Sequence, residues 1–181
     1  MSTVVAFVGY PASGKSEAAR MAADMGIPVV CMGDVVREEA ARMGLSPTDE
    51  ALGAVACMLR EREGMDSIAR RTLPTLRRLL TEHDVVVLDG IRGIAEVHFF
   101  RQHLGAAFRL VHILSPFSLR LERIRSRQRS DAILTPEELR RRDEREEGWG
   151  LREAMAMADV VIANEGTLEE LRERIEKVLR S

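Results

Sequence analysis

The sequence predicts an α/β fold with three layers, in which helices cover both faces of a five-stranded parallel sheet. Short apolar runs rich in β-branched residues are typical of strands buried on both faces. Segments of helical length separate these runs, and capping boxes at Thr135 with Glu138 and at Thr167 with Glu170 mark where two helices begin. The predicted strands are 3–8, 27–32, 84–90, 108–114 and 160–163.

The first strand leads into Gly9-Tyr10-Pro11-Ala12-Ser13-Gly14-Lys15-Ser16, a complete match to G-x-x-x-x-G-K-S/T, and a helical segment follows at once. We call residues 9–16 the phosphate loop. Gly9 and Gly14 allow backbone angles closed to other residues, so N–H groups can point inward at an anion beside the positive end of the next helix. Lys15 would reach the β- and γ-phosphates, and Ser16 would bind Mg²⁺. The alternative is that residues 9–16 are a glycine-rich turn that only joins the strand to the helix. The order of strand, loop and helix favours phosphate binding.

Composition supports a chemical role for Lys15. Only Lys15 and Lys177 are lysines among the 27 basic residues. In a chain that otherwise uses arginine, a lysine at this position indicates a chemical requirement. We therefore predict that the protein binds a nucleoside triphosphate, ATP, together with Mg²⁺.

Bulk properties limit the remaining choices. The 181 residues suggest a single domain, 1–181, and a net charge of −2 gives no field that favours nucleic acid or an anionic membrane. Cys31 and Cys57 fit neither a disulfide framework nor metal-ligand spacing, so we expect buried, inert thiols. The chain starts with a strand and lacks an apolar run of the roughly 18 to 20 residues that spans a bilayer. We expect a cytoplasmic protein.

Polar residues follow the second and third predicted strands, and the carboxyl ends of parallel strands meet at one edge of a sheet. Asp89 ends an apolar strand, and a carboxylate at this position could bind Mg²⁺ directly or through water. The alternative is that Asp89 only forms a turn with the Gly that follows it. Asp34 and Arg37 lie three residues apart and share a helix face. They would face an acceptor substrate, unless they form only a local ion pair or Asp34 is only an N-cap. Arg92 is expected in the same crevice.

The segment of about 34–80 is helical in character and long for a crossover between two strands, so we predict a small helical insertion. Ser46 would cap one of its helices. Gly64 would break the helical stretch, and Pro74 would kink it.

Two explanations compete for the arginine-rich segment of about 120–147. Charge runs are usually solvated helix faces. The alternative is a lid that closes over phosphates, because arginine forks match phosphate oxygens. We expect Arg123 and Arg127 to reach phosphate, the rest of the run to stay in water, and the charges at 140–147 to form mostly surface pairs. The run consists of Arg120, Arg123, Arg125, Arg127 and Arg129.

The order of GYPASGKS, MGDVVREEA, VVVLDGIR and an arginine-rich segment ending in RSD resembles the P-loop kinases of nucleotides. Segment 33–37 resembles the adenylate kinase element that grips the acceptor's phosphate with its arginine. The resemblance implies that Arg37 and the helical insertion bind the acceptor. Asp89-Gly90-Ile91-Arg92 is similar to that family's Asp-Gly-Phe-Pro-Arg segment, but it lacks the proline and places its arginine one residue early.

Segment 158–171 is more similar to dephospho-CoA kinases, in which this loop lies near the adenine, and this implies a contact from Asn164. In those kinases an Asp after the second strand is the catalytic base, which corresponds to Asp34. Over its whole length the chain most resembles archaeal proteins named only as adenylate-kinase-related or nucleotide kinase-like. The resemblance implies a P-loop NTPase fold. The expected nucleotide-binding residues are Gly9, Pro11, Ala12, Ser13, Gly14, Lys15, Ser16, Glu17 and Asn164.

The leading interpretation is ATP-dependent phosphoryl transfer to a nucleotide or nucleotide-like acceptor, as in nucleoside monophosphate kinases. The candidate catalytic residues are Lys15, Asp34, Arg123 and Arg127. The candidate acceptor-binding residues are Asp34, Arg37, Asp89 and Arg92, and the candidate Mg²⁺ ligands are Ser16 and Asp89.

Other classes stay open or are disfavoured. Transfer to a hydroxyl, as in dephospho-CoA kinases, would ask Asp34 to orient or deprotonate the acceptor. An RNA-binding or assembly ATPase would use the arginine run on a phosphate backbone, although the run lacks aromatic residues for base stacking. A GTPase is disfavoured because neither lysine supplies an Asn-Lys-x-Asp motif. We expect a small-molecule acceptor as partner, neither nucleic acid nor membrane, and a monomer or a small homo-oligomer.

Overall fold

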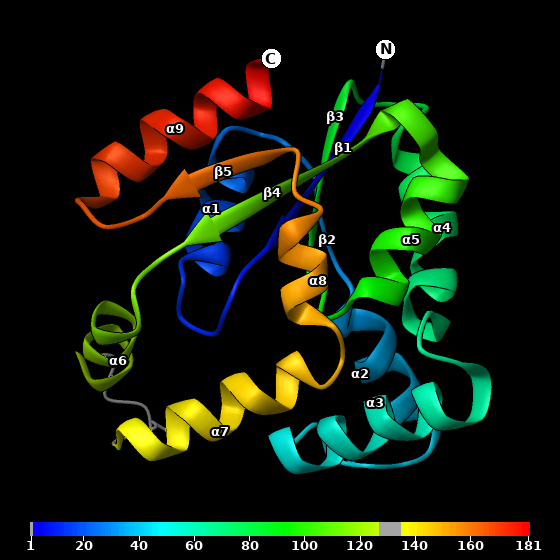
Figure 1. Cartoon of the computed structure of the whole chain (residues 1–181). Coiled ribbons are helices and arrows are strands. Elements are labelled where there is room, and N and C mark those ends of the chain that lie inside the picture. Colours follow the sequence, from blue (N-terminus) through cyan, green and yellow to red (C-terminus); the bar gives the residue numbers. More distant parts are fainter. Residues whose placement is uncertain (1, 127–134) are drawn as a thin grey trace.

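The computed structural model describes residues 2–126 and 135–181 (Figure 1). Its sheet has five parallel strands in the order β2-β3-β1-β4-β5, which confirms the predicted α/β architecture. The central position of β1 places the phosphate loop in the middle of the sheet's carboxyl edge. The strands are β1 (Thr3–Val8), β2 (Val29–Cys31), β3 (Val85–Asp89), β4 (Phe108–Leu114) and β5 (Val160–Ala163).

Helices lie on both faces of the sheet and at its carboxyl edge (Figure 1). A short 3-10 turn, Gly105–Ala107, precedes β4. The helices are α1 (Lys15–Asp24), α2 (Gly33–Arg42), α3 (Asp49–Glu63), α4 (Ser67–Leu79), α5 (Ile94–Leu104), α6 (Phe117–Ser126), α7 (Pro136–Glu147), α8 (Leu151–Ala156) and α9 (Leu168–Arg180).

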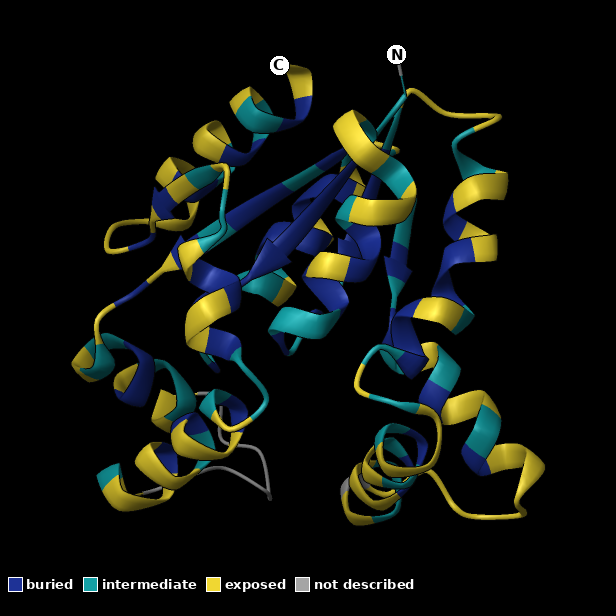
Figure 2. Cartoon of the chain, turned by 45° about the vertical axis from the view of Figure 1, so that its right-hand side comes forward, coloured by how far each residue is buried: buried dark blue, intermediate teal, exposed yellow. Residues whose placement is uncertain are grey.

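The side chains of β1 explain why its sequence is apolar throughout. Val4, Ala6 and Val8 pack into a core cluster with residues of α4, α5 and α8. Val5 and Phe7 point the other way and pack with residues of α1 and α9. Both faces of the strand are therefore buried, and Figure 2 shows the sheet as a dark layer between helices that are exposed on their outer sides.

The predicted helical insertion corresponds to α2, α3 and α4, and the break at Gly64 is confirmed by its φ of 103° between α3 and α4. Thr48, rather than Ser46, caps α3: its side chain accepts a hydrogen bond from Ala51 N at 3.2 Å. The N-cap of α2 is Met32, so the alternative role of Asp34 as an N-cap is wrong. Helix α4 continues through Pro74.

Other local expectations need correction. Cys57 is exposed and Cys31 is half-buried, so the expectation of two buried thiols was wrong. The capping boxes at Thr135 and at Thr167 are both present, as predicted. Among the described residues, no helix is both long and apolar enough to cross a membrane.

A close backbone approach joins the start of α5 to the segment between α7 and α8. The Cα of Gly93 lies so near Trp149 that an added Cβ would overlap the Trp149 carbonyl oxygen. The backbone of Gly93 is extended, with φ −156°, so the constraint is space and not conformation.

Gly93→Ala should therefore lower the free energy of unfolding by about 1–3 kcal/mol, because a backbone oxygen cannot move aside as a flexible side chain can. Denaturant unfolding measures the change. Gly53→Ala is the matched control, since a Cβ at Gly53 in α3 meets nothing within 4 Å. That control should be neutral or stabilising by about 0.5–1 kcal/mol. Equal stability of the two variants would contradict the close approach.

Candidate functional site

The phosphate loop joins β1 to α1 in a tight path. Gly14 has φ 113° and Ala12 has φ 62°, both in the left-handed region. A Cβ at Gly9 would come within 2.6 Å of Ile113 O and of Ser13 Oγ, and one at Gly14 would overlap Asn164 Nδ2. Gly14 is therefore required by space and by conformation, whereas Gly9 lies outside the left-handed region and is required by space alone.

The carbonyl oxygen of Ser13 anchors the loop from β4 and β5. It accepts a hydrogen bond from Asn164 Nδ2 at 2.9 Å, and the Ser115 hydroxyl lies 3.0 Å away. Arg123 Nη1 lies 3.5 Å from Ser13 O and donates to Ser115 Oγ at 2.9 Å, while its Nη2 donates to Asn164 O at 2.8 Å. The Ser115 hydroxyl also lies 2.8 Å from Asn164 O. The Ser115 hydroxyl thus joins the phosphate loop, the loop after β5 and Arg123 of α6.

Arg123 and Asn164 thus hold the shape of the phosphate loop. Asn164 is 7% exposed, and its amide is committed to the loop carbonyl. The predicted contacts of Asn164 with adenine and of Arg123 with phosphate stay predictions. Arg127 lies outside the described residues, as does most of the predicted lid between Arg123 and Thr135.

Lys15 folds back onto the loop that carries it. Its Nζ donates to Gly9 O at 2.7 Å and to Tyr10 O at 2.9 Å. The pKa of Lys15 is lowered to about 8, chiefly by burial and then by the charge of Arg92, while the carboxylates of Glu146 and Asp89 oppose the shift. The side chain of Lys15 is half-buried, so an anionic ligand in the loop could still reach its ammonium group.

Helix α7 packs against the phosphate loop through an acidic face, which the sequence analysis missed. Arg120 is 3% exposed and forms two hydrogen bonds, of 2.9 and 2.8 Å, with the carboxylate of Asp143. The same guanidinium donates to Pro11 O at 3.2 Å and lies 4.7 Å from the centre of the Tyr10 ring. The Tyr10 hydroxyl donates to Glu147 Oε1 at 2.5 Å. Arg120 was expected in water, and that expectation was wrong.

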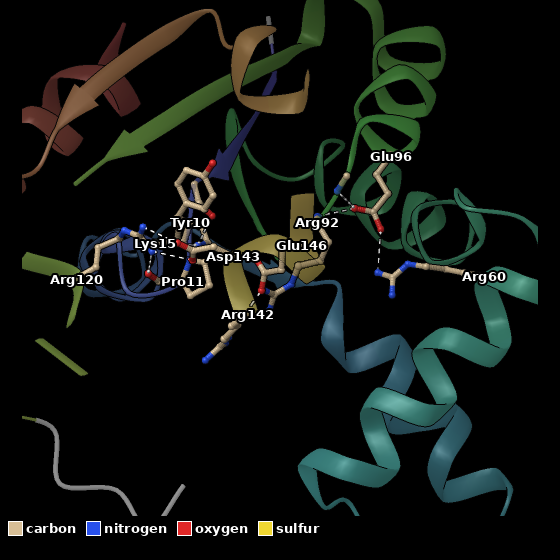
Figure 3. Close-up of polar contacts among 12 residues, drawn as sticks. Tyr10, Pro11, Lys15, Arg60, Arg92, Glu96, Arg120, Arg142, Asp143 and Glu146 are labelled. Carbon is tan, nitrogen blue, oxygen red and sulfur yellow. Dashed lines mark hydrogen bonds and ion pairs between the residues drawn. The ribbon is translucent and has the colours of Figure 1, made fainter. Parts of the chain in front are cut away.

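Glu146 lies on the same face of α7 and is 3% exposed. Its Oε1 accepts from Arg92 Nη1 at 3.0 Å and lies 3.8 Å from Arg142 Nε (Figure 3). Asp143, Glu146 and Glu147 follow the i, i+3, i+4 spacing of one helix face, and this spacing is the signal in the sequence that could have revealed them. The expectation of mostly surface pairs at 140–147 was therefore wrong for Asp143 and Glu146, which are buried, whereas Arg140 pairs with Glu137 at the surface.

The loop after β3 is fixed by a buried acid of α5. Glu96 is 2% exposed, and its Oε2 accepts from the N–H groups of Arg92 at 2.7 Å and Gly93 at 3.3 Å. Its Oε1 lies 3.5 Å from Arg60 Nη2, and Arg60 stacks 4.9 Å over the Trp149 ring. Burial raises the pKa of Glu96, while these donors oppose the rise. The backbone of Arg92 is thus set by α5, with α3 packed beside it.

The predicted acceptor residues divide into two groups. Asp34 and Arg37 pair with each other at 2.5 Å on α2, with side chains 61% and 48% exposed, and Arg37 Nη2 also lies 3.6 Å from Cys31 Sγ. Asp89 and Arg92 lie close enough to Lys15 to shift its pKa. Asp89 and Arg92 thus lie near the phosphate loop, while Asp34 and Arg37 form the local ion pair that was the alternative, and their contact with an acceptor stays a prediction.

Ser16 and Asp89 suit the binding of Mg²⁺. Ser16 is exposed in the first turn of α1, next to Lys15, and Asp89 ends β3 with a half-buried side chain that acts electrostatically on Lys15. A hydroxyl and a carboxylate are hard oxygen ligands, and Mg²⁺ normally completes its shell with water and phosphate oxygens. Two protein ligands are therefore enough.

Comparison with known proteins identifies the family. Residues 8–147 match the model of a family described as AAA domain. A UPF0200 protein of Methanosarcina acetivorans is 49% identical over 181 residues, covering 100% of this chain and 96% of the relative. A UPF0200 protein of Pyrococcus horikoshii is 40% identical, covering 97% and 95%. The chain belongs to the UPF0200 family. It spans only 54% of a longer UPF0200/UPF0201 protein of Archaeoglobus fulgidus, to which it is 57% identical over 176 residues.

Solved structures similar to this UPF0200 protein are P-loop kinases. A shikimate kinase from Acinetobacter baumannii superposes with a TM-score of 0.55 at 19% identity, covering 99% of this chain and 94% of the other. A gluconokinase from Sinorhizobium meliloti gives 0.54 at 16% identity, covering 99% and 94%. At these identities the likeness concerns the fold, which is that of the P-loop kinases. The predicted fold and the resemblance to archaeal kinase-like proteins are confirmed.

The Arg120–Asp143 pair makes the first prediction for the site. Asp143→Ala should lower the free energy of unfolding by about 3–5 kcal/mol, because it leaves a buried guanidinium without its counter-charge. Replacing both partners, by Arg120→Met with Asp143→Leu, should recover part of the loss. Denaturant unfolding of the three proteins measures this.

Arg140→Ala is the control, because its pair with Glu137 is exposed, with side chains 58% and 66% accessible. That substitution should cost under about 1 kcal/mol. If Asp143→Ala were no worse than this control, the pair would not hold α7 on the phosphate loop.

Proposed function

We propose that this UPF0200 protein is an ATP-dependent phosphotransferase that acts on a nucleotide or nucleotide-like acceptor. The observation that carries the proposal is the phosphate loop, with a desolvated Lys15 facing charged residues from β3 and α7. A loop with this backbone and lysine suits the β- and γ-phosphates of ATP. The P-loop kinase fold supports the assignment to phosphoryl transfer.

Positioning and charge would supply most of the rate, because phosphoryl transfer asks little covalent chemistry of the protein. Lys15 and the N–H groups at the start of α1 would hold the β- and γ-phosphates. Arg92 would add positive charge where the transferred group gains negative charge. Ser16 and Asp89 would hold Mg²⁺, which neutralises phosphate charge when bound.

The role of Asp34 depends on the acceptor. A phosphate monoester oxygen is already a nucleophile and needs no base, so Asp34 and Arg37 would then only orient the acceptor. A hydroxyl acceptor would need a base, and Asp34 is an exposed carboxylate with one partner, Arg37, for that purpose. The names of the structural neighbours, a shikimate kinase and a gluconokinase, keep small non-nucleotide acceptors as second candidates.

The structure offers little support for an RNA-binding ATPase. That function would need the arginine run as an exposed surface. Arg120 is instead buried with Asp143, and Arg123 donates to Ser115 and Asn164. A cytoplasmic location, a monomer or small homo-oligomer, and Mg²⁺ dependence remain part of the proposal.

Turnover is the test. With Mg²⁺, wild-type protein should consume ATP when given one member of a panel of nucleoside monophosphates, dephospho-CoA, shikimate and gluconate. Lys15→Ala should abolish consumption and leave the melting temperature nearly unchanged, because the buried ammonium group costs desolvation in the free protein. Equal turnover in wild type and a folded Lys15→Ala variant, or none with any acceptor, would refute the proposal.

The pKa of Lys15 predicts a pH dependence of binding. Because the pKa of Lys15 is about 8, the free protein loses this charge as pH rises from 8 toward the ordinary value of 10.5. Bound phosphate favours the charged form, so ATP affinity should be level below pH 8 and should fall above it. Calorimetric titration at several pH values measures the slope.

Lys15→Ala, whose residual binding can be measured at higher ATP concentrations, should lose this pH dependence. Arg92, Glu146, Asp89 and Arg142 face Lys15, and His112 senses its charge. Burial lowers the pKa of His112 from its ordinary value of 6.5, so His112 does not titrate above pH 8, where ATP affinity should fall. A slope that persisted in Lys15→Ala would assign the dependence to another group.

A further inference from the structure

Glu146 is a buried acid that the proposed chemistry does not use. It lies in the last turn of α7, with its side chain 4% exposed. Its Oε1 faces Arg92 at 3.0 Å and Arg142 at 3.8 Å. Its Oε2 is buried and has no hydrogen-bond partner within 2–126 and 135–181. An unsatisfied oxygen of a buried carboxylate is costly, so its presence there needs an explanation.

The surroundings of Glu146 carry an excess of positive charge. Lys15 from the phosphate loop, Arg92 from the loop after β3, and Arg142 with Arg145 from α7 all interact electrostatically. The carboxylates of Glu146, Asp89 and Asp143 oppose them, and Asp143 is already paired with Arg120. Figure 3 shows Arg92 and Arg142 meeting at the Glu146 carboxylate. The side chains of Arg92 and Arg142 are 37% and 40% accessible, so a ligand from solvent can reach both. The same groups would suit a larger anion better than one carboxylate.

We infer that Glu146 is a resident counter-ion that occupies a phosphate-binding position between Arg92 and Arg142, and that a phosphate group of the substrate displaces it. This inference rests on the proposed function, because it assumes that the crevice beside Lys15 takes phosphorylated ligands. The two arginines come from different elements and lie beside the same carboxylate, Arg92 hydrogen-bonded to it and Arg142 with its Nε 3.8 Å away, so both are near before the ligand arrives.

The exchange makes Glu146 a specificity-determining residue. A phosphate monoester carries about two charges and three terminal oxygens, whereas Glu146 satisfies the site with one charge and leaves Oε2 unused. A ligand with a single carboxylate has the same charge as Glu146 and gains little by replacing it. A phosphate has one more negative charge than Glu146 and can accept more hydrogen bonds, so it competes better for the two arginines. Glu146 thus weakens the binding of every anion at this position and favours phosphate over carboxylate.

Charge removal at Glu146 is the decisive experiment. Glu146→Gln keeps the shape and removes the competing charge, and Glu144→Gln makes the same change on the exposed side of α7. Titration calorimetry uses inorganic phosphate, MgATP, MgADP and AMP as probes. Relative to Glu144→Gln, Glu146→Gln should bind a phosphate probe about tenfold more tightly or better, because a like charge a few ångströms away is gone at an effective dielectric of about 20. Glu146→Asp keeps the charge and should stay near wild type.

The choice of probes identifies the source of the phosphate. A gain for MgATP without a gain for MgADP assigns the position to the γ-phosphate of the donor. A gain for AMP in the presence of MgADP assigns it to the acceptor. Adding Arg142→Met to Glu146→Gln should remove the gain in either case, because the phosphate then loses one of its two arginines.

Equal or weaker binding of every probe by Glu146→Gln, compared with Glu144→Gln, would overturn the inference. Such a result would mean that Glu146 serves only to hold the two arginines. The proposed function is tested separately, by turnover of the wild type. Tighter phosphate binding by Glu146→Gln without wild-type turnover would contradict only the kinase function. Wild-type turnover without tighter binding by Glu146→Gln would contradict only the role of Glu146 as a counter-ion.

Discussion

A loop that binds an anion with its N–H groups must have its carbonyl oxygens held elsewhere, and this constraint organises the structure. A carbonyl oxygen turned toward a phosphate would repel it, and a buried one without a donor would be costly. Side chains from four parts of the chain supply the donors, so α6 and the ends of β4 and β5 must all converge on the loop after β1. The donors are Lys15 on Gly9 and Tyr10, Arg120 on Pro11, and Ser115, Arg123 and Asn164 on Ser13.

The parts of the structure that could be predicted are those whose form is determined by residues close together in the sequence. The apolar strands, the phosphate loop and both capping boxes depend on short-range periodicity and spacing, so their positions follow from neighbouring residues alone. The strand that ends at Asp89 and the break at Gly64 belong to the same class. The five-stranded parallel sheet follows in turn, because strands buried on both faces need helices on both sides.

The contacts that could not be predicted are those in which a residue has more than one possible partner and the folded structure determines which partner is near. Ser115 carried no signal of a role in the phosphate loop, yet its hydroxyl lies between two loop carbonyls that come close once β4 and β5 pair. Arg120 belongs to a run that looks solvated, and only the packing of α7 provides Asp143 to bury it. The spacing of the acids on α7 was visible in the sequence. Leu139, which lies one turn before Asp143 and is buried with Asp143 and Glu146, also marked the face of that helix that turns inward.

Arg92 is the point at which these constraints meet. Its N–H is held by Glu96 of α5, and its guanidinium by Glu146 of α7. Its positive charge lowers the pKa of Lys15 in the phosphate loop. The backbone of the residue is therefore fixed by one helix and its side chain by another, while α3 reaches the same acid through Arg60. Any ligand that draws the Arg92 guanidinium away from Glu146 changes the charge felt by α7 and by Lys15 together. If the proposed acceptor binds Arg92, its binding would therefore be coupled to Lys15 and the phosphate loop electrostatically through this one side chain.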